Sequence, residues 1–317
     1  MNTFPSIKAV TPAESASTGS TRSSTDVFVM RPSWSDYLSL TKPEITFLVT
    51  LSALAGFVLA SPEGISGWTL LWALVGIPLV SAGGAALNHL AEREYDGRMK
   101  RTANRPLPAG RISPSQVLMM AFLLITAGLF ILCPLTNPLT GVLAGISVIL
   151  YVWVYTPLKR KTPFNTLVGT LPGALPALGG WTAATGDFGA GGWAIFSLLL
   201  FWQMPHFMAL AWMYKNDYSQ AGYRMWTEGD DSGSRTVWIM IGFSILMYGS
   251  SILIYGLGLS GMIYLVGAIA LAIWFSLPVF RFYMSRSVQD ARKVLKTTVF
   301  YIPLLLLLIV IDRLLSS

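Results

Sequence analysis

The chain has 317 residues, of which 53% are hydrophobic and only 12% are charged, and its formal net charge is +7. Soluble domains carry roughly 25% charged residues, so this composition excludes a disordered chain and makes an integral membrane protein the first expectation. The positive excess resembles a nucleic-acid signature, but in a membrane protein it marks the cytoplasmic side, so we expect no nucleic-acid partner.

The first 34 residues are rich in Ser and Thr and lack the apolar core of a signal peptide. We expect them to form a disordered tail, residues 1–34, in front of a single transmembrane domain over residues 35–317. A mitochondrial transit peptide would hold more Arg and fewer acids than this tail, which contains Glu14 and Asp26. The bacterial cytoplasmic membrane is therefore favoured over the mitochondrial inner membrane.

Apolar segments dominate the rest of the chain. A helix needs about 20 mainly apolar residues to cross a bilayer core. Nine segments qualify: 44–61, 68–90, 117–133, 138–156, 164–184, 190–214, 235–257, 261–281 and 297–315. Of the 22 Lys and Arg residues, 21 fall on the same side of these nine spans. The positive-inside rule then predicts an all-α membrane protein with its N-terminus in the cytoplasm and its C-terminus outside.

The fifth segment contains an unusual run of small and ring-bearing residues. These are Pro172, Gly173, Pro176, Gly179 and Gly180. They allow either a kinked helix that brings a bulky ligand close to the backbone, or close packing between helices. Both interpretations stay open at this point.

Three polar residues end the second segment. Asn88, Glu92 and Asp96 follow one another at a spacing of four, which places them near one helix face. Oxygen ligands of this kind suit Mg²⁺, which commonly takes one or two carboxylates together with the phosphates of a substrate. The alternative is an ordinary solvated end of a cytoplasmic helix.

Basic residues surround this acidic group in two predicted cytoplasmic loops. The first loop contains Arg101, Thr102 and Arg105, and the second follows Tyr155 with Lys159, Arg160 and Asn165. A metal-bound diphosphate needs such a mixture, because the metal neutralises part of the charge and Arg and Lys bind the other oxygens. The positive-inside rule alone explains some of these cations, but the clustering of acidic with basic residues favours a binding site.

The sixth segment carries Gln203 and His206, which are three residues apart and share a helix face. A histidine at this depth needs a partner, a ligand or a metal. A structurally satisfied histidine is the alternative. Lys215 and Asp217 follow directly after this segment and are further candidates for substrate binding.

These motifs, taken together and in order, resemble the protohaem IX farnesyltransferases, or haem O synthases, a branch of the UbiA-type intramembrane prenyltransferases. The resemblance runs from about residue 35 to the C-terminus. It rests on Leu40-Thr41-Lys42-Pro43, on Asn88 with Glu92 and Asp96, on Arg101-Thr102 with Arg105-Pro106, on Tyr155-Thr156-Pro157-Leu158-Lys159-Arg160, on Trp202-Gln203-Met204-Pro205-His206-Phe207 and on Asp217-Tyr218.

The resemblance implies a bundle of nine helices around a central cavity that is capped by cytoplasmic loops. It also implies a reaction, in which the farnesyl group of farnesyl diphosphate is transferred to a vinyl group of haem B to make haem O. Haem B would be a substrate and Mg²⁺ the cofactor. The product would feed haem-copper oxidases, so haem A synthase and terminal oxidase assembly factors are candidate partners.

Site roles also follow from the resemblance. Asn88, Glu92 and Asp96 match the first polar motif of the superfamily, with Glu in place of the middle Asp, and would hold Mg²⁺ on the diphosphate. The chain departs from the superfamily at the second aspartate-rich motif, where His206 stands near the expected first aspartate and only Asp217 remains. This shifts diphosphate binding toward the basic residues Arg101, Arg105, Lys159 and Arg160, and the resemblance implies that Tyr155 faces the allylic cation.

The histidine content narrows the choice of haem ligand. The chain has only two histidines, His89 and His206, so imidazole ligation of a haem iron would use one of them. The sequence alone does not choose between them. Two other functions remain as alternatives: a prenyltransferase acting on an aromatic quinone precursor, and a haem transporter or carrier.

Overall fold

The computed structural model describes residues 32–61, 64 and 66–316. Most of the predicted tail, residues 1–31, lies outside this described part. Trp34, the last residue of the predicted tail, is the first residue of a helix. The Ser33 side chain accepts a hydrogen bond from the backbone of Asp36, whose carboxylate accepts in turn from the Ser33 backbone, and this capping box explains why the helix begins there.

All secondary structure within the described residues is helical. The elements in chain order are α1 (Trp34–Leu40), α2 (Pro43–Leu59), α3 (Gly67–Asp96), α4 (Pro114–Leu135), α5 (Pro138–Ile149), the π-helix η1 (Leu150–Tyr155), α6 (Thr156–Leu158), α7 (Asn165–Thr185), α8 (Ala190–Met213), α9 (Lys215–Gln220), α10 (Ser234–Gly256), α11 (Met262–Ser285) and α12 (Val288–Ser316).

Seven helical segments of the described chain are long and apolar enough to cross a membrane, or eight if α1 and α2, which meet at a bend of 48°, form one broken span. This is a multi-pass membrane protein. The prediction of nine spans and of the orientation of the termini is not confirmed.

A helix, α7, lies at the fifth predicted position, but it is not among the seven apolar segments. Its Gly, Thr and Pro residues lower its hydropathy, and because most of it is buried against other helices it need not match the lipid.

Helix α3 extends beyond its apolar segment, as the spacing of the three polar residues predicted. The apolar segment ends at residue 90, where charged side chains begin, whereas α3 continues to Asp96 and is capped by Gly97. Ala, Glu and Arg in its last two turns favour helix. As a result Asn88, Glu92 and Asp96 stand on one continuous helix.

The helix that follows α5 changes its winding. Residues Leu150–Tyr155 form the π-helix η1, and the Tyr151 and Tyr155 rings stack with centroids 5.8 Å apart. The Thr156 hydroxyl donates to the Tyr151 carbonyl at 2.8 Å, which supports the wider turn. Single π-turns inside helices are frequent at functional sites.

Small residues allow α2 and α7 to approach closely. A Cβ placed on Gly180 would lie 1.9 Å from the Ala53 carbonyl oxygen, and one on Gly56 would lie 2.0 Å from the Ala177 carbonyl oxygen. Gly180 therefore serves helix packing. Pro172, Pro176 and Gly179, on the same helix, instead line a cavity, and the approach of a bulky ligand to this part of the helix stays a prediction.

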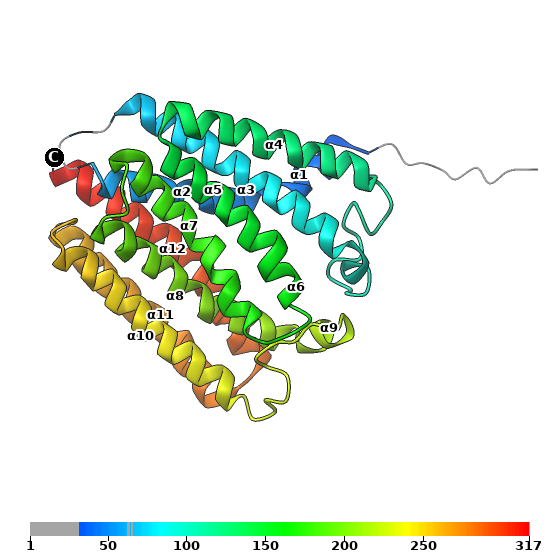
Figure 1. Ribbon diagram of the computed structural model, residues 1–317. Coiled ribbons are helices and arrows are strands. Elements are labelled where there is room, and N and C mark those ends of the chain that lie inside the picture. Colours follow the sequence, from blue (N-terminus) through cyan, green and yellow to red (C-terminus); the bar gives the residue numbers. More distant parts are fainter. Residues whose placement is uncertain (1–31, 62–63, 65, 317) are drawn as a thin grey trace, which may run out of the picture. The chain divides into compact units, whose positions relative to one another are not determined.

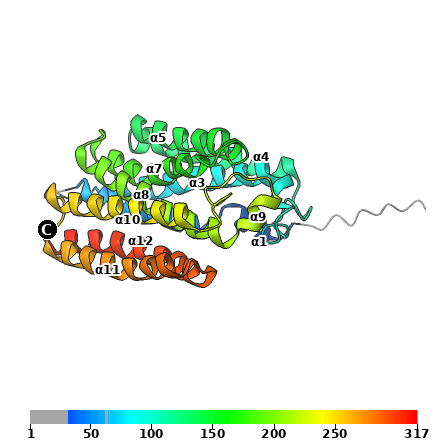
Figure 2. The same cartoon turned by 90° about the horizontal axis from the view of Figure 1, so that it is seen from below.

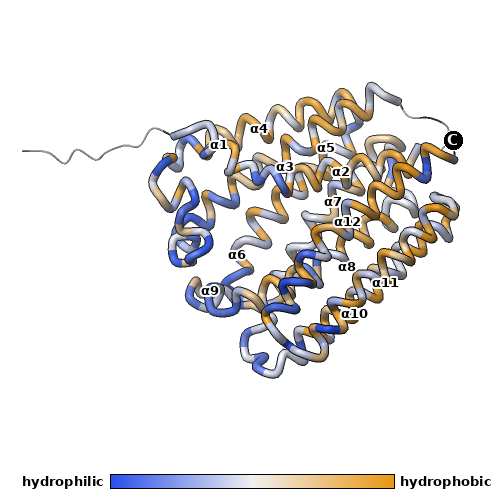
Figure 3. The backbone as a smooth tube through the Cα atoms, turned by 180° about the vertical axis from the view of Figure 1, so that it is seen from behind, coloured by the Kyte–Doolittle hydropathy of each residue, from blue (hydrophilic) through white to orange (hydrophobic). Residues whose placement is uncertain are grey.

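The polar connections gather at one end of the helices. Figures 1 and 3 show the segment after α3, the turn around α6 and the segment around α9 at this end, while the helices themselves are coloured as hydrophobic over most of their length. Figure 2 shows α11 and α12 side by side beneath α10. The loops that carry most of the predicted cytoplasmic cations thus lie near the ends of α3 and α6.

Candidate active site

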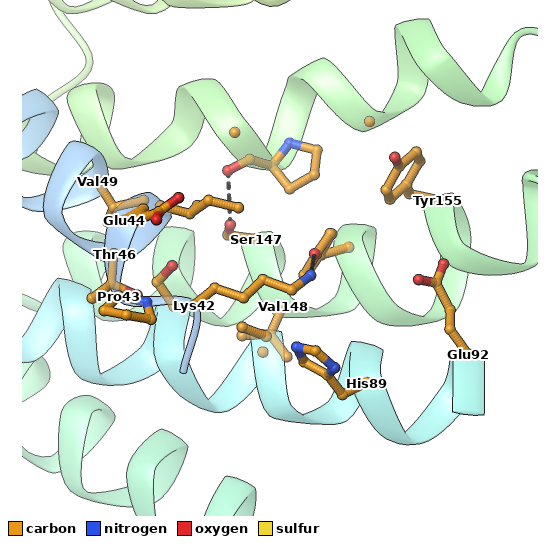
Figure 4. Close-up of a pocket in the computed structure, with 18 of the residues that line it drawn as sticks. Lys42, Pro43, Glu44, Thr46, Val49, His89, Glu92, Ser147, Val148 and Tyr155 are labelled. Carbon is orange, nitrogen blue, oxygen red and sulfur yellow. Dashed lines mark hydrogen bonds between the residues drawn. The ribbon is translucent and has the colours of Figure 1, made fainter. Parts of the chain in front are cut away.

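A cavity of about 970 Å³ opens between α2, α3, α5, η1, α7 and α8. This volume is at the upper end of the range of roughly 300–1,000 Å³ that small-molecule sites occupy. Its deeper wall is apolar, with Val49, Ile77, Val80, Leu143 and Leu175. Charged side chains from the polar end of the helices complete it: Lys42, Glu92, Asp96, Arg101, Arg105 and Lys159. Figure 4 shows part of this lining.

Asp96, the last residue of α3, forms the first of two ion pairs in this lining. One of its carboxylate oxygens, Oδ2, accepts a hydrogen bond from Arg105 at 2.7 Å, and the residue is only 1% exposed. The other oxygen, Oδ1, is buried and has no partner within the described chain. Buried carboxylate oxygens are costly to leave unpaired, so this oxygen needs a partner that the described chain does not supply.

Glu92 and Lys159 form the second ion pair. Their Oε1 and Nζ atoms are 2.5 Å apart, and Lys159 also lies over the Tyr155 ring, 4.5 Å from its centroid. Burial disfavours the charged ammonium, but Glu92 together with Tyr155, Tyr151 and Tyr223 outweighs burial and raises the pKa of Lys159 well above its usual value. Lys159 therefore stays positively charged at neutral pH and can bind an anion.

Asn88 is fully buried, and both ends of its amide are engaged. Its oxygen accepts from Lys42 Nζ at 2.8 Å and from the Tyr151 hydroxyl at 3.2 Å, while its nitrogen donates to the Thr156 hydroxyl at 3.0 Å. In this structure Asn88 therefore orients Lys42 and Tyr151. Its predicted role as a metal ligand would require these bonds to change.

The other two predicted site residues of the first basic loop, Arg101 and Thr102, have different surroundings. Arg101 lines the cavity and lies over the Tyr214 ring, 5.2 Å from its centroid. The buried Thr102 hydroxyl donates to the Asp96 backbone carbonyl at 2.8 Å. Thr102 thus fixes the turn that follows α3, while Arg101 faces the cavity.

In the second basic loop, some residues line the cavity and others do not. Tyr155 lines the cavity, and its ring packs directly against Gly169. Asn165 also lines the cavity, but its amide nitrogen donates to the carbonyls of Thr162 and Arg224, each at 2.7 Å. Arg160, in contrast, is exposed and donates to the Tyr95 hydroxyl.

The sixth predicted segment contributes Gln203 to the cavity. Its amide nitrogen donates to the Thr170 and Leu199 carbonyls, each at 3.0 Å. His206 lies on the same helix, and its Nδ1 is hydrogen-bonded to the Thr298 hydroxyl of α12 at 2.8 Å. The two side chains therefore have different surroundings, although they are three residues apart.

Lys215 and Asp217 lie on the short helix α9. The Lys215 ammonium is 3.0 Å from the carboxylate of Asp231, and it also lies over the Trp212 ring. The backbone carbonyl of Asp217 accepts from Ala221 at 3.1 Å and so helps to end α9. These contacts place both residues in the polar loop region that follows α8.

Sequence reasoning gave no site role to three polar cavity residues. These are Lys42, Tyr151 and Tyr223. Lys42 sits between α1 and α2 with φ of 49°, a left-handed conformation, and its ammonium reaches Asn88 on α3. Its place in the Leu40–Pro43 motif was the available signal. Nothing in the sequence pattern distinguished Tyr151 or Tyr223 from other tyrosines of the chain.

The carboxylates of α3 fit a magnesium ion held jointly with a substrate. Among the described residues, no three His, Cys, Asp or Glu side chains come together to hold a metal on their own. Glu92 and Asp96 both line the cavity, and Asp96 Oδ1 is unpartnered. Because Mg²⁺ commonly uses one or two carboxylates and completes its shell with phosphates and water, two carboxylates are sufficient.

Comparison with known proteins assigns the family. Residues 49–304 match the UbiA prenyltransferase family. The chain belongs to this family. A Salinibacter ruber relative named "Protoheme IX farnesyltransferase" is 52% identical over 277 residues, which cover 87% of this chain and 98% of the relative. A Solibacter usitatus relative of the same name is 38% identical over 288 residues, which cover 88% of this chain and 98% of the relative.

Solved structures share the UbiA fold. A structure of digeranylgeranylglyceryl phosphate synthase matches with a TM-score of 0.73 and 18% identity, over 88% of this chain and 98% of the other. A UbiA homologue from Archaeoglobus fulgidus, bound to GPP and Mg²⁺, matches with a TM-score of 0.64 and 15% identity, over 87% of this chain and 99% of the other. At these identities the likeness concerns the fold.

Proposed function

We propose that this UbiA prenyltransferase transfers the farnesyl group of farnesyl diphosphate to a vinyl group of haem B, with Mg²⁺ as cofactor, to give haem O and diphosphate. The observation that carries the proposal is the cavity, in which two carboxylate–cation pairs, Glu92–Lys159 and Asp96–Arg105, border a large apolar space. Relatives at up to 52% identity that are named for farnesyl transfer to protohaem support the choice of substrates.

The charged end of the cavity suits the diphosphate. Lys159, Arg105 and Arg101 supply positive groups, and Glu92 and Asp96 supply the carboxylates that would hold Mg²⁺. When bound there, Mg²⁺ would neutralise part of the diphosphate charge and make it a better leaving group. The basic side chains stabilise the negative charge that develops on the diphosphate as the carbon–oxygen bond breaks.

The apolar part of the cavity suits the farnesyl chain and the porphyrin. In the reaction the allylic carbon loses the diphosphate and bonds to the terminal vinyl carbon of haem B. The resulting cation next to the ring is captured by water, which releases a proton and leaves the hydroxyl group of haem O. The stacked Tyr151 and Tyr155 rings and the apolar wall keep other water from the allylic centre.

The setting of the enzyme follows from the same proposal. We place it in a bacterial cytoplasmic membrane with nine spans, its N-terminus in the cytoplasm and its C-terminus outside, because the cation-bearing loops share one end of the helices. Haem A synthase and terminal oxidase assembly factors are the candidate partners, since they consume haem O. Asn88, Thr102, Tyr155, Arg160, Asn165, Gln203, His206, Lys215 and Asp217 remain proposed site residues.

One assay tests the function. Purified protein in detergent is incubated with haem B, farnesyl diphosphate and Mg²⁺, and the products are separated and identified by mass spectrometry. We expect haem O, with equimolar diphosphate released, and no product when Mg²⁺ is chelated. Transfer to an aromatic quinone precursor, with no haem O formed, would contradict the proposal and favour the alternative acceptor. Haem bound without any transfer would instead favour a carrier.

A further inference from the structure

His89 is a buried histidine whose ring has no partner. It is 4% exposed and lines the cavity, and neither Nδ1 nor Nε2 has a hydrogen-bond partner within the described chain. Buried polar atoms are nearly always hydrogen-bonded, so two orphaned nitrogens on one buried ring need an explanation. Figure 4 shows the ring beside the Lys42 side chain, on the stretch of α3 that leads to Glu92.

The neighbouring polar groups do not account for this ring. Lys42 directs its ammonium to Asn88 and to the Tyr151 hydroxyl, at 2.8 and 2.9 Å. The other histidine of the chain, His206, is satisfied differently, because its Nδ1 is bonded to Thr298 at 2.8 Å. Of the two imidazoles, only His89 lines the cavity, and neither of its buried nitrogens is engaged by the described chain.

We propose that the His89 imidazole is an axial ligand of the iron of the haem substrate. This inference rests on the proposed function, since it takes haem B as the occupant of the apolar cavity. A neutral imidazole nitrogen is a common ligand of haem iron. Coordination would satisfy one of the orphaned nitrogens, and a water molecule or a haem substituent can satisfy the other.

The position of His89 on α3 suits the reaction. His89 precedes Glu92 by three residues, which is slightly less than one turn, or about 4.5 Å along the helix axis. Iron held at His89 would therefore lie deeper in the cavity than the diphosphate held near Glu92 and Asp96. The vinyl groups stand at the edge of the macrocycle, so a porphyrin anchored through its centre can present one of them to the allylic carbon. Ligation would thus orient the acceptor for the bond-forming step.

The test compares ligands with and without iron. Wild-type protein is titrated with ferric haem and with metal-free protoporphyrin IX, and absorption and electron paramagnetic resonance spectra are recorded. Coordination predicts that ferric haem binds at least about tenfold more tightly than metal-free protoporphyrin, because loss even of outer-shell partners commonly costs a metal site 10–100-fold. It also predicts spectra typical of an imidazole-ligated haem. Equal affinity for the two porphyrins would overturn the inference without any variant.

Variants give a second, independent readout. His89→Gly should lose the imidazole-type spectrum and bind ferric haem at least about tenfold more weakly, with metal-free protoporphyrin and farnesyl diphosphate binding unchanged, and added imidazole should restore the spectrum. His206→Ala tests the other imidazole of the chain by the same spectrum. A wild-type spectrum in His89→Gly, or its loss in His206→Ala, would contradict the inference.

Turnover in the same preparations separates this inference from the proposed function. If wild-type protein makes haem O while the haem spectrum does not depend on His89, only the ligand assignment fails. If wild-type protein makes no haem O and binds no haem, the proposed function fails, and the ligand assignment fails with it.

Discussion

The close approach of α2 and α7 gives a prediction with a geometric magnitude. In Gly180→Ala the new Cβ would lie 1.9 Å from the Ala53 carbonyl oxygen, whereas ordinary contacts begin at 3.4 Å. The two backbones must therefore separate by about 1.5 Å at this point, since a carbonyl oxygen cannot turn away as a side chain can. Overpacking of this kind costs about 1–3 kcal/mol, and small residues are what permits close helix packing in a membrane.

Thermal unfolding of the detergent-solubilised protein measures this cost. In domains of about 150–250 residues, 1 kcal/mol corresponds to about 2–4 °C in Tm, so we expect Gly180→Ala to lower Tm by several degrees. The matched control is Gly145→Ala in α5, where a Cβ meets nothing within 4 Å. There the better helix propensity of Ala should leave Tm equal or slightly higher. Equal Tm values for the two variants would refute the packing argument.

Two further predictions concern single carboxylates. Asp96→Asn should reduce Mg²⁺-dependent turnover at least about tenfold, because it removes a proposed metal ligand and the partner of Arg105. The control, Glu94→Gln at an exposed neighbouring position, should keep turnover near wild type. Similar kinetics in the two variants would contradict the metal role of Asp96. Asp230 accepts from the backbone and hydroxyl of Thr236, and although burial alone would raise the pKa of Asp230, these bonds lower it below 3.8. A carboxyl whose pKa is lower in the folded than in the unfolded state stabilises the fold at a pH above its unfolded pKa. This stabilisation is lost as the pH falls through the folded pKa. The Tm difference between wild type and Asp230→Asn should therefore shrink from pH 7 toward pH 3, and a constant difference would contradict the role of Asp230.

The helix positions were the most predictable part of the fold. Long apolar runs mark them directly, and most of the long helices begin and end within a few residues of the predicted boundaries. The prediction was less accurate where a helix changes environment. Helix α12 begins at Val288, in the charged stretch before its predicted start at residue 297, and α7 is surrounded by protein and so lacks the hydropathy of a lipid-facing span.

The site was predictable only in its local part. The spacing of Glu92 and Asp96 identified one wall of the cavity, since both lie on one helix. Their partners depend on tertiary packing: Lys159 is 67 residues away from Glu92 along the chain. The hydrogen bond between His206 and Thr298, which are 92 residues apart, depends on tertiary packing as well and could not be predicted from the sequence. A sequence shows which side chains need a partner, but contacts between distant helices decide which ones have it.

The two ion pairs of the cavity have a consequence for turnover. In the structure Lys159 and Arg105 already hold the carboxylates of Glu92 and Asp96. In the proposed site, an incoming diphosphate with its metal would displace these internal partners, and a departing one would allow them to pair again. The protein's own charges would thus compete with the product for the same positions. Such competition would weaken the retention of released diphosphate, and product release often limits the rate of an enzyme.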